Sequence, residues 1–170
     1  TERAFLAQRR FYSTLAPQSN EKLFEVHAPS TRDPNVLNPL MDQMAELGFE
    51  QLQAPEHPGG FNYSDLSPGN VESMKRICDY AKTKGIRVGA YQLMIASVGW
   101  GADVDCIDPV SNKPGSMFGQ SVCAASKWSD MYYENMWKMF DLTGMGAYKP
   151  DGPYHGDPCA PKPHPHHRAL

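Results

Sequence analysis

The segment that most constrains the fold is Ile86–Met94, a run that is nearly continuously apolar. Such a run is typical of a strand buried on both faces of a parallel sheet, and Gly89 would allow close packing there. The segment before it repeats apolar residues at helical spacing from Val71 to Ala81 and ends at Gly85. A helix that leads directly into a buried strand predicts a parallel α/β sheet.

The same alternation of strand and helix continues through the rest of the chain. We expect a lead-in helix within residues 1–20, and the remaining segments follow in order: strand Lys22–His27, helix Pro39–Leu47, strand Phe49–Gln53, a helix after a possible Asn70 N-cap, strand Ile86–Met94, helix Ser126–Gly144 and a last short strand from Tyr148 to Asp151. This order predicts an α/β fold with parallel strands and right-handed crossovers.

The predicted elements amount to about half of a (β/α)₈ TIM barrel. A complete barrel needs about 250 residues, and this chain has 170. We therefore expect residues 21–170 to be the first half of such a barrel, with four βα units, preceded by the lead-in helix of residues 1–20.

The amino-acid composition and net charge limit the kinds of molecule that this chain is expected to bind. Hydrophobic residues make up 41% of the chain and aromatic residues 11%, which favours a folded domain over disorder. A net charge of −3 gives no electrostatic reason to expect nucleic acid, and no apolar stretch is long enough to span a bilayer. We expect neither a nucleic-acid nor a membrane partner.

Cysteines and a sequon point to an extracellular protein. The four cysteines are compatible with two disulfides in three pairings, and their spacings match no zinc-site pattern: Cys78, Cys106, Cys123 and Cys159. We favour a Cys106–Cys123 disulfide, since these two residues bracket one loop. Asn62 begins an N-glycosylation sequon in a polar loop. We therefore expect a secreted glycoprotein.

The last predicted strand carries the leading catalytic candidate. It ends at Asp151, inside a stretch rich in glycine and proline. A barrel strand presents a catalytic residue at its C-terminal mouth in this way. The alternative interpretation is a structural turn aspartate, because Pro-Asp-Gly is a common turn sequence.

Other polar and aromatic residues near strand ends are candidates for sugar contacts. Carboxylates and imidazoles there can hydrogen-bond sugar hydroxyls, although a strand-end histidine is as often a satisfied structural group; these residues are Glu25, His27, Glu56 and His57. Trp100 and Tyr154 lie in loops and offer flat rings to the C–H face of a sugar, whereas Trp128 opens a helix and is predicted to pack. We add His155 and Asp157 to the predicted substrate contacts, with loop bracing as the alternative role of Asp157.

The end of the chain is dense in potential metal ligands. These ligands are His155, Asp157, Cys159, His164, His166 and His167. Their spacing fits neither a helix nor a strand that would bring the side chains together. We predict no metal site and no cofactor.

Several of these segments resemble a known family. Gly85–Tyr91, Cys123–Trp128, Lys149–Gly152, His155–Ala160 and His164-Pro165 resemble bacterial α-galactosidase-like glycoside hydrolases of the retaining TIM-barrel clan. The resemblance covers the chain from about Leu23 to Leu170.

The resemblance implies a role for the Lys149-Pro150-Asp151 motif. In that clan a Lys-x-Asp pattern ends the fourth strand, so Asp151 would be the nucleophile. Lys149, two residues away on the same side of a strand, would hold it ionised. The clan's general acid/base ends a sixth strand, beyond the segment that matches here. Asp157 and Glu56 are the alternatives within the chain, and neither occupies that position.

These sequence features are compatible with three alternative functions. The first is a retaining hydrolase of α-galactoside-type linkages in oligo- or polysaccharides, with Asp151 as nucleophile. The second is a non-catalytic sugar-binding or structural module, which would complete its sheet by self-association or with a further segment, because an open sheet exposes its edges. The third is an extracellular assembly protein without a sugar ligand.

Overall fold

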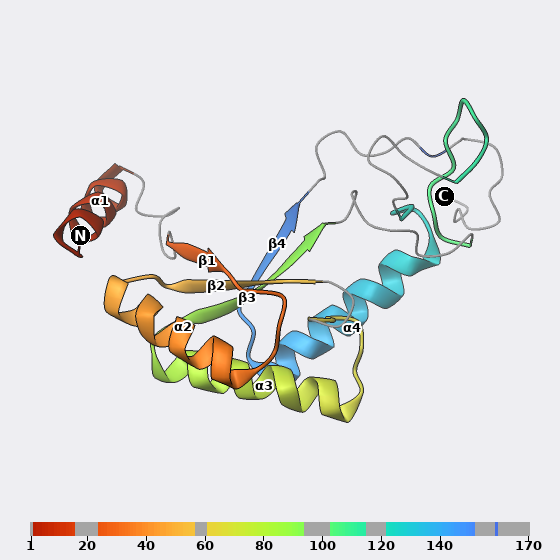
Figure 1. Ribbon diagram of the computed structural model, residues 1–170. Helices are drawn as coiled ribbons and strands as arrows, with labels where there is room; N and C mark the ends of the chain where they lie inside the picture. The colour runs from red at the N-terminus through yellow and green to blue at the C-terminus, as the bar shows by residue number, and fades with distance from the viewer. Residues whose placement is uncertain are drawn as a thin grey trace. The chain divides into compact units, whose positions relative to one another are not determined.

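The computed structural model describes residues 2–15, 24–56, 61–93, 103–114, 122–151 and 159. Its elements follow in order (Figure 1): α1 (Glu2–Leu15), β1 (Glu25–His27), α2 (Pro34–Leu47), β2 (Gln51–Pro55), α3 (Pro68–Thr83), β3 (Arg87–Leu93), α4 (Lys127–Thr143) and β4 (Ala147–Asp151). Two compact units share the chain, Thr1–Tyr91 with Lys138–Lys149, and Gln92–Trp137 with Pro150–Leu170. Among the helices described, none has the length and apolar character of a membrane span.

The strands form one sheet in sequence order, β1-β2-β3-β4. β1 pairs with β2 in parallel and β2 with β3 in parallel, with Glu25 opposite Gln51 and Gln51 opposite Arg87. Parallel neighbours need a crossover connection, and α2 and α3 supply it between these strands. The predicted α/β class with parallel strands is confirmed.

One face of the sheet is apolar and packs against helices. Leu52 and Ala54 of β2 and Val88 and Ala90 of β3 are buried, and strand alternation places them on a common face. Figure 1 shows α2 and α3 side by side on one side of the sheet. Their buried residues complete this core: Leu37, Met41, Met44, Met74, Ile77 and Ala81.

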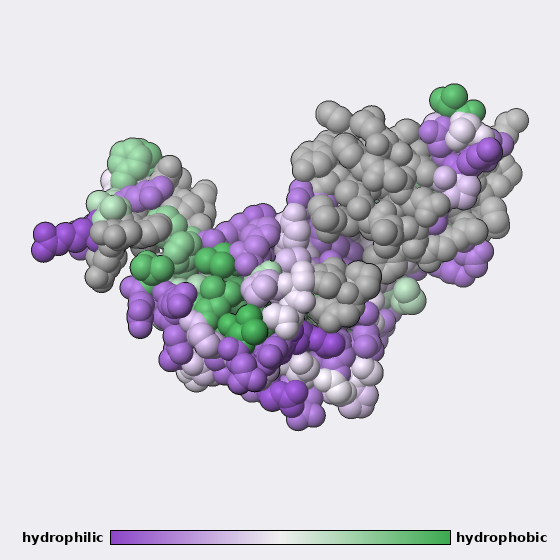
Figure 2. All heavy atoms as spheres, viewed as in Figure 1, coloured by the Kyte–Doolittle hydropathy of each residue, from purple (hydrophilic) through white to green (hydrophobic). Residues whose placement is uncertain are grey.

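The outer surfaces of α2 and α3 are those of amphipathic helices. On the face drawn in Figure 2, hydrophilic residues cover most of this region, beside a band of hydrophobic residues where β1 and α2 lie. Val36 and Leu47 are the large hydrophobic residues of α2 that are exposed. A helix with one buried stripe and a polar remainder is expected when it covers a sheet.

The opposite face of the sheet is polar, which differs from the prediction that β3 is apolar on both sides. A Cβ atom placed on Gly89 would lie 2.7 Å from Oε1 of Gln53 and 3.1 Å from Cβ of Ala147. The Gln53 side chain therefore occupies the space over Gly89. The predicted close packing at Gly89 is confirmed, and the nearest atom there is polar.

Both middle helices begin earlier than predicted, and α2 has a side-chain cap at its start. α2 starts at Pro34, because Asp33 accepts a hydrogen bond of 2.9 Å from the backbone N–H of Asn35 and proline suits the first helical turn. α3 starts at Pro68 with Ser67 in the N-cap position. The prediction of Asn70 as the cap is wrong.

Asn70 instead ties the preceding loop to α3. It is buried in the first turn of the helix, and its Nδ2 donates to the carbonyl oxygens of Asn62, at 2.8 Å, and Asp65, at 2.7 Å. A buried amide that holds two backbone carbonyls removes two unsatisfied acceptors.

The helix predicted from residue 126 to 144 is present as α4, and Trp128 packs as expected. The indole is 3% exposed. It stacks on the ring of Tyr132, with 4.5 Å between centroids and 16° between planes. Trp128 and Tyr132 thus belong to a packed cluster, whereas Trp137 of the same helix is 53% exposed.

Gly89→Ala should test the contact between β3 and the polar face. The added methyl group must displace the buried Gln53 amide, so we expect the free energy of unfolding to fall by about 1–3 kcal/mol. Gly69→Ala is the matched control, because a Cβ there meets nothing within 4 Å and the site is helical. Urea denaturation measures both, and an unchanged Gly89→Ala midpoint would contradict this packing.

Candidate functional site

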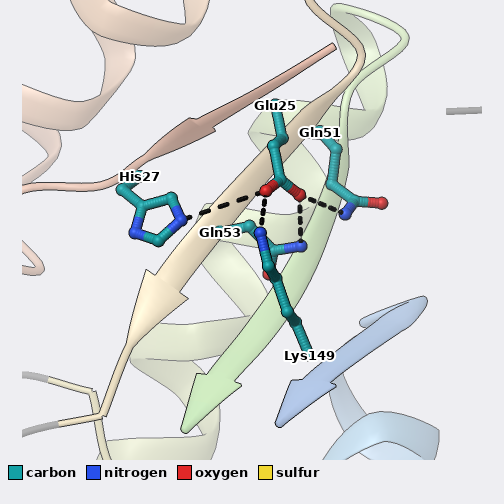
Figure 3. Close-up of polar contacts among 5 residues, drawn as sticks. All are labelled: Glu25, His27, Gln51, Gln53 and Lys149. Carbon is teal, nitrogen blue, oxygen red and sulfur yellow. Dashed lines mark hydrogen bonds and ion pairs between the residues drawn. The ribbon is translucent and has the colours of Figure 1, made fainter. Parts of the chain in front are cut away.

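A polar cluster on the sheet is the candidate site, and we call it the Glu25 cluster: Glu25, His27, Gln51, Gln53 and Lys149 (Figure 3). Oε1 of Glu25 accepts a hydrogen bond from Nζ of Lys149. Oε2 accepts from Nε2 of Gln53 at 3.0 Å and from Nε2 of Gln51 at 3.3 Å. Nε2 of His27 lies 4.0 Å from Oε1. One carboxylate therefore gathers groups from three strands.

The parallel register explains why these residues meet. Glu25 and His27 alternate on β1, and they lie opposite Gln51 and Gln53 on β2. Residues two apart on a strand share a face, and paired positions in a parallel ladder carry their side chains to the same face. Figure 3 shows Lys149 extending from β4 toward Glu25.

Glu25 is held as a carboxylate. Burial alone would raise its pKa, but the hydrogen bonds from Lys149 and Gln53 and the positive charge of Lys149 outweigh burial and leave the pKa below its ordinary value. The side chain is 28% exposed, so its charge is only partly screened by solvent. Glu25 is therefore a fixed anion at neutral pH.

The cluster has a buried floor and an accessible rim. Gln53 is 1% exposed, and its Oε1 accepts no hydrogen bond from any described residue. The side chain of His27 is 47% exposed and its ring lies 4.7 Å from that of Tyr91, centroid to centroid. An unpaired buried acceptor costs about 1–3 kcal/mol, which a donor from a bound molecule would recover. Such an arrangement suits a ligand rich in hydroxyl groups.

Lys149 and Asp151 have the positions that the sequence predicted, with one difference in pairing. Asp151 is the last residue of β4, and Lys149 precedes it by two positions. Strand alternation gives both the same face of β4. The Lys149 ammonium pairs with Glu25, and no pattern in the sequence connects these two residues.

Glu56 braces a loop. Its Oε1 accepts a hydrogen bond of 3.2 Å from the backbone N–H of Tyr63, and its own N–H donates to the carbonyl oxygen of Tyr91 at 2.9 Å. Tyr63 is fully buried, and its hydroxyl donates to the carbonyl oxygen of Ala54. The predicted contact of Glu56 with sugar thus competes with a structural role.

Asn62 lies on the surface in a tight turn. Its Oδ1 accepts from the backbone N–H groups of Ser64 and Asp65, at 3.1 and 3.2 Å. This is the local pattern that asparagine favours in turns. Asn62 itself is therefore exposed, whereas Tyr63 in the middle of the sequon is buried, and use of the sequon remains a prediction.

Several predicted residues lie outside the described part of the chain. They are His57, Trp100, Tyr154, His155 and Asp157 from the predicted sugar contacts, and His164, His166 and His167 from the predicted histidine-rich end.

The predicted Cys106–Cys123 disulfide is not formed. None of the four cysteines forms a disulfide in the structure, and the Sγ atoms of Cys106, Cys123 and Cys159 lie within 4.8 Å of one another. Cys106 and Cys123 do lie together, but the sulfur of Cys159 lies beside them. Cys78 stands apart on α3, where burial raises its pKa to about 12.

Sequence reasoning missed Gln51 and Gln53. The available signal was their alternation with Leu52 and Ala54, which marks a strand with one polar and one apolar face. Glutamine on a central strand suggests a buried hydrogen-bonding face, because an unpaired amide is costly there.

Comparison with known proteins finds only remote likeness. No protein-family model and no curated protein matches the sequence. A Salmonella typhimurium protein assigned as an alpha amylase aligns over 75% of this chain and 25% of its own, at 13% identity and a TM-score of 0.49. A beta-N-acetylhexosaminidase aligns over 80% of this chain and 39% of its own, at 15% identity and a TM-score of 0.46.

A xylose isomerase-like TIM barrel fused to a 4-hydroxyphenylpyruvate dioxygenase aligns over 75% of this chain and 16% of its own, at 15% identity and a TM-score of 0.36. The chain thus spans well under half of each of these structures. Likeness at this level establishes neither a closed barrel nor an activity for this chain.

Glu25→Gln should lower stability in a pH-dependent way. At pH near 7 we expect a loss of about 1–3 kcal/mol, because Lys149 loses a charged acceptor. A carboxyl group whose pKa is lower in the folded state stabilises the fold above its unfolded pKa, about 4.3, and this contribution disappears as pH falls through the lower folded pKa. The wild type and the variant should therefore converge in acid.

Chemical denaturation across that pH range measures the difference. Glu72→Gln is the control, because Glu72 is an exposed i,i+4 partner of Arg76 on α3 and should change stability by less than about 0.5 kcal/mol. A Glu25→Gln deficit that stays constant down to acid pH would show that the Glu25 charge is not the cause.

Proposed function

We propose that this chain forms the first half of the (β/α)₈ barrel of a retaining glycoside hydrolase that acts on α-galactoside-type linkages. The proposal is supported by four strands in sequence order, by helices on one face and by a polar opposite face. In a barrel, the opposite face would be the interior.

The observation that carries the proposal is the position of Asp151. It ends the fourth strand of the sheet, within the Lys-Pro-Asp motif whose resemblance to α-galactosidase-like enzymes implies a nucleophile. Catalytic groups of barrel enzymes occupy the C-terminal ends of strands. A strand-end carboxylate is the group that such chemistry needs.

The reaction assigned to Asp151 is the first half of retaining hydrolysis. Its carboxylate attacks the anomeric carbon, a carbon–oxygen ester bond forms, and the bond to the leaving oxygen breaks. A second carboxyl group, about 5–5.5 Å away, protonates that oxygen and later activates water to cleave the ester. We assign no residue of this chain to that second role.

The Glu25 cluster would bind the sugar. Glu25 offers carboxylate lone pairs, Lys149 offers ammonium hydrogens, and Oε1 of Gln53 is a buried acceptor without a described partner. Together they provide the mixture of donors and acceptors that hydroxyl groups require. Lys149 would therefore have two roles: it pairs with Glu25, and it donates hydrogen bonds to the substrate.

We also propose that the protein is secreted and that its sheet is completed by another polypeptide segment or by a second copy of this chain. β1 and β4 are the outer strands in the sheet order. Parallel strands with an unpaired edge offer N–H and C=O groups to a neighbour. Asn62 is exposed and therefore open to glycosylation in a secretory host.

Trapping of a glycosyl ester tests the nucleophile. An α-galactosyl fluoride with a second fluorine on the ring reacts without acid assistance, because fluoride leaves unprotonated, and its ester hydrolyses slowly. We expect a covalent sugar on Asp151, detected by peptide mass spectrometry. Asp151→Asn should block labelling and lower turnover of an activated α-galactoside more than about 1,000-fold.

Asp141→Asn is the matched control, because Asp141 is an exposed residue of α4 and its substitution should leave labelling unchanged. Labelling at another carboxylate, or turnover that survives in Asp151→Asn, would overturn the assignment of Asp151. Circular dichroism of each variant separates loss of chemistry from loss of fold.

A non-catalytic sugar-binding module is the second candidate. The observation that favours it is the Glu25 cluster itself, whose carboxylate, amide and ammonium groups could bind hydroxyl groups without any reaction. Under this alternative, binding of α-galactosides persists at wild-type affinity in Asp151→Asn and is lost in Lys149→Met. Titration calorimetry distinguishes the two, and absence of binding in the folded wild type would exclude the module.

A further inference from the structure

Three cysteines that are far apart in sequence converge in the second compact unit. The Sγ atoms of Cys106, Cys123 and Cys159 all lie within 4.8 Å of one another. Cys106 and Cys123 are each 3% exposed, and Cys159 is partly buried. Three converging sulfurs are more than one disulfide can use.

The backbone fixes two of these sulfurs before any bond is made. Asp105 and Val122 form an antiparallel bridge, and the N–H of Cys123 donates to the carbonyl oxygen of Val104 at 2.7 Å. This pairing holds Cys106 and Cys123 next to each other. The N–H of Ile107 donates to Sγ of Cys159 at 3.3 Å and brings in the third.

The surroundings of the sulfurs suit thiolates that face a cation. The backbone amides of Ile107 and Ala125 point at the sulfurs of Cys159 and Cys123. Amide donors favour the charged form of an acceptor.

We propose that Cys106, Cys123 and Cys159 bind a Zn²⁺ ion. Zinc binds cysteine sulfur at about 2.3 Å in tetrahedral geometry, which separates two ligand sulfurs by about 3.8 Å. The observed separations need to contract by about 1 Å at most. Soft sulfur ligands select zinc over magnesium or calcium.

Binding is an exchange of protons for metal, without oxidation or reduction. Each thiol releases one proton to solvent as its sulfur bonds to zinc, so affinity falls as pH falls. Zinc has a fourth position, which solvent or another ligand fills. The ion would tie the 104–107 and 122–125 segments to residue 159, a structural role separate from the hydrolase chemistry assigned to Asp151.

Metal content of purified protein, prepared with zinc and under reducing conditions, is the primary test. We expect about one zinc per chain, and its loss in Cys106→Ser, Cys123→Ser and Cys159→Ser. Cys78→Ser is the control, because Cys78 is a buried cysteine on α3 outside the cluster, and it should keep the metal.

Cobalt substitution of the wild-type protein gives a second test, which does not depend on whether the cysteine variants fold. Co²⁺ in a tetrahedral thiolate site gives intense visible and sulfur-to-metal charge-transfer bands, which zinc should abolish by displacement. Weak bands of a six-coordinate aqueous ion, zinc far below one equivalent, or zinc retained in the three cluster variants would overturn the proposal. So would a disulfide between any two of the three cysteines in peptide maps of protein purified with zinc.

Discussion

The ion pair between Glu25 and Lys149 links the two outer strands, and the polar face depends on it. Three interstrand steps of about 4.8 Å separate β1 from β4. Glu25 also hydrogen-bonds Gln51 and Gln53, so its side chain leans over β2, and Lys149 must reach across β3. A sheet that twists and curls toward this face shortens that reach. The contact therefore favours curvature of the kind that barrels have.

This bridge explains why β3 has glycine at its centre. Gly89 leaves the space in which Gln53 lies, and Gln53 in turn donates to Glu25. A larger residue there would remove a donor from a partly buried carboxylate and leave charge that is costly to bury. The polar face is thus one connected system, in which the glycine provides space, the amide a donor and the ammonium a compensating charge.

Local pattern predicted most of the fold but only part of the site. The spacing of Met74 and Ile77, and the apolar run that includes Val88, were sufficient to predict α3 and β3, since both are set by periodicity. The start of α2 depended on the cap at Asp33 and the start of α3 on the proline after Ser67, and periodicity contains neither. Contacts between distant positions, such as Glu25 with Lys149 or Cys106 with Cys159, arise from strand order and loop closure. The spacing of residues along the sequence does not predict such contacts.

The pairing of Lys149 changes what the lysine can do for Asp151. A lone ammonium two residues away on one strand would favour the ionised carboxylate through its full charge. Lys149, however, already compensates an ionised Glu25, and an ion pair acts on a third group mainly as a dipole, whose field falls off faster than that of a charge. Lys149 acts chiefly on Glu25, as the group that keeps this carboxylate charged and in place.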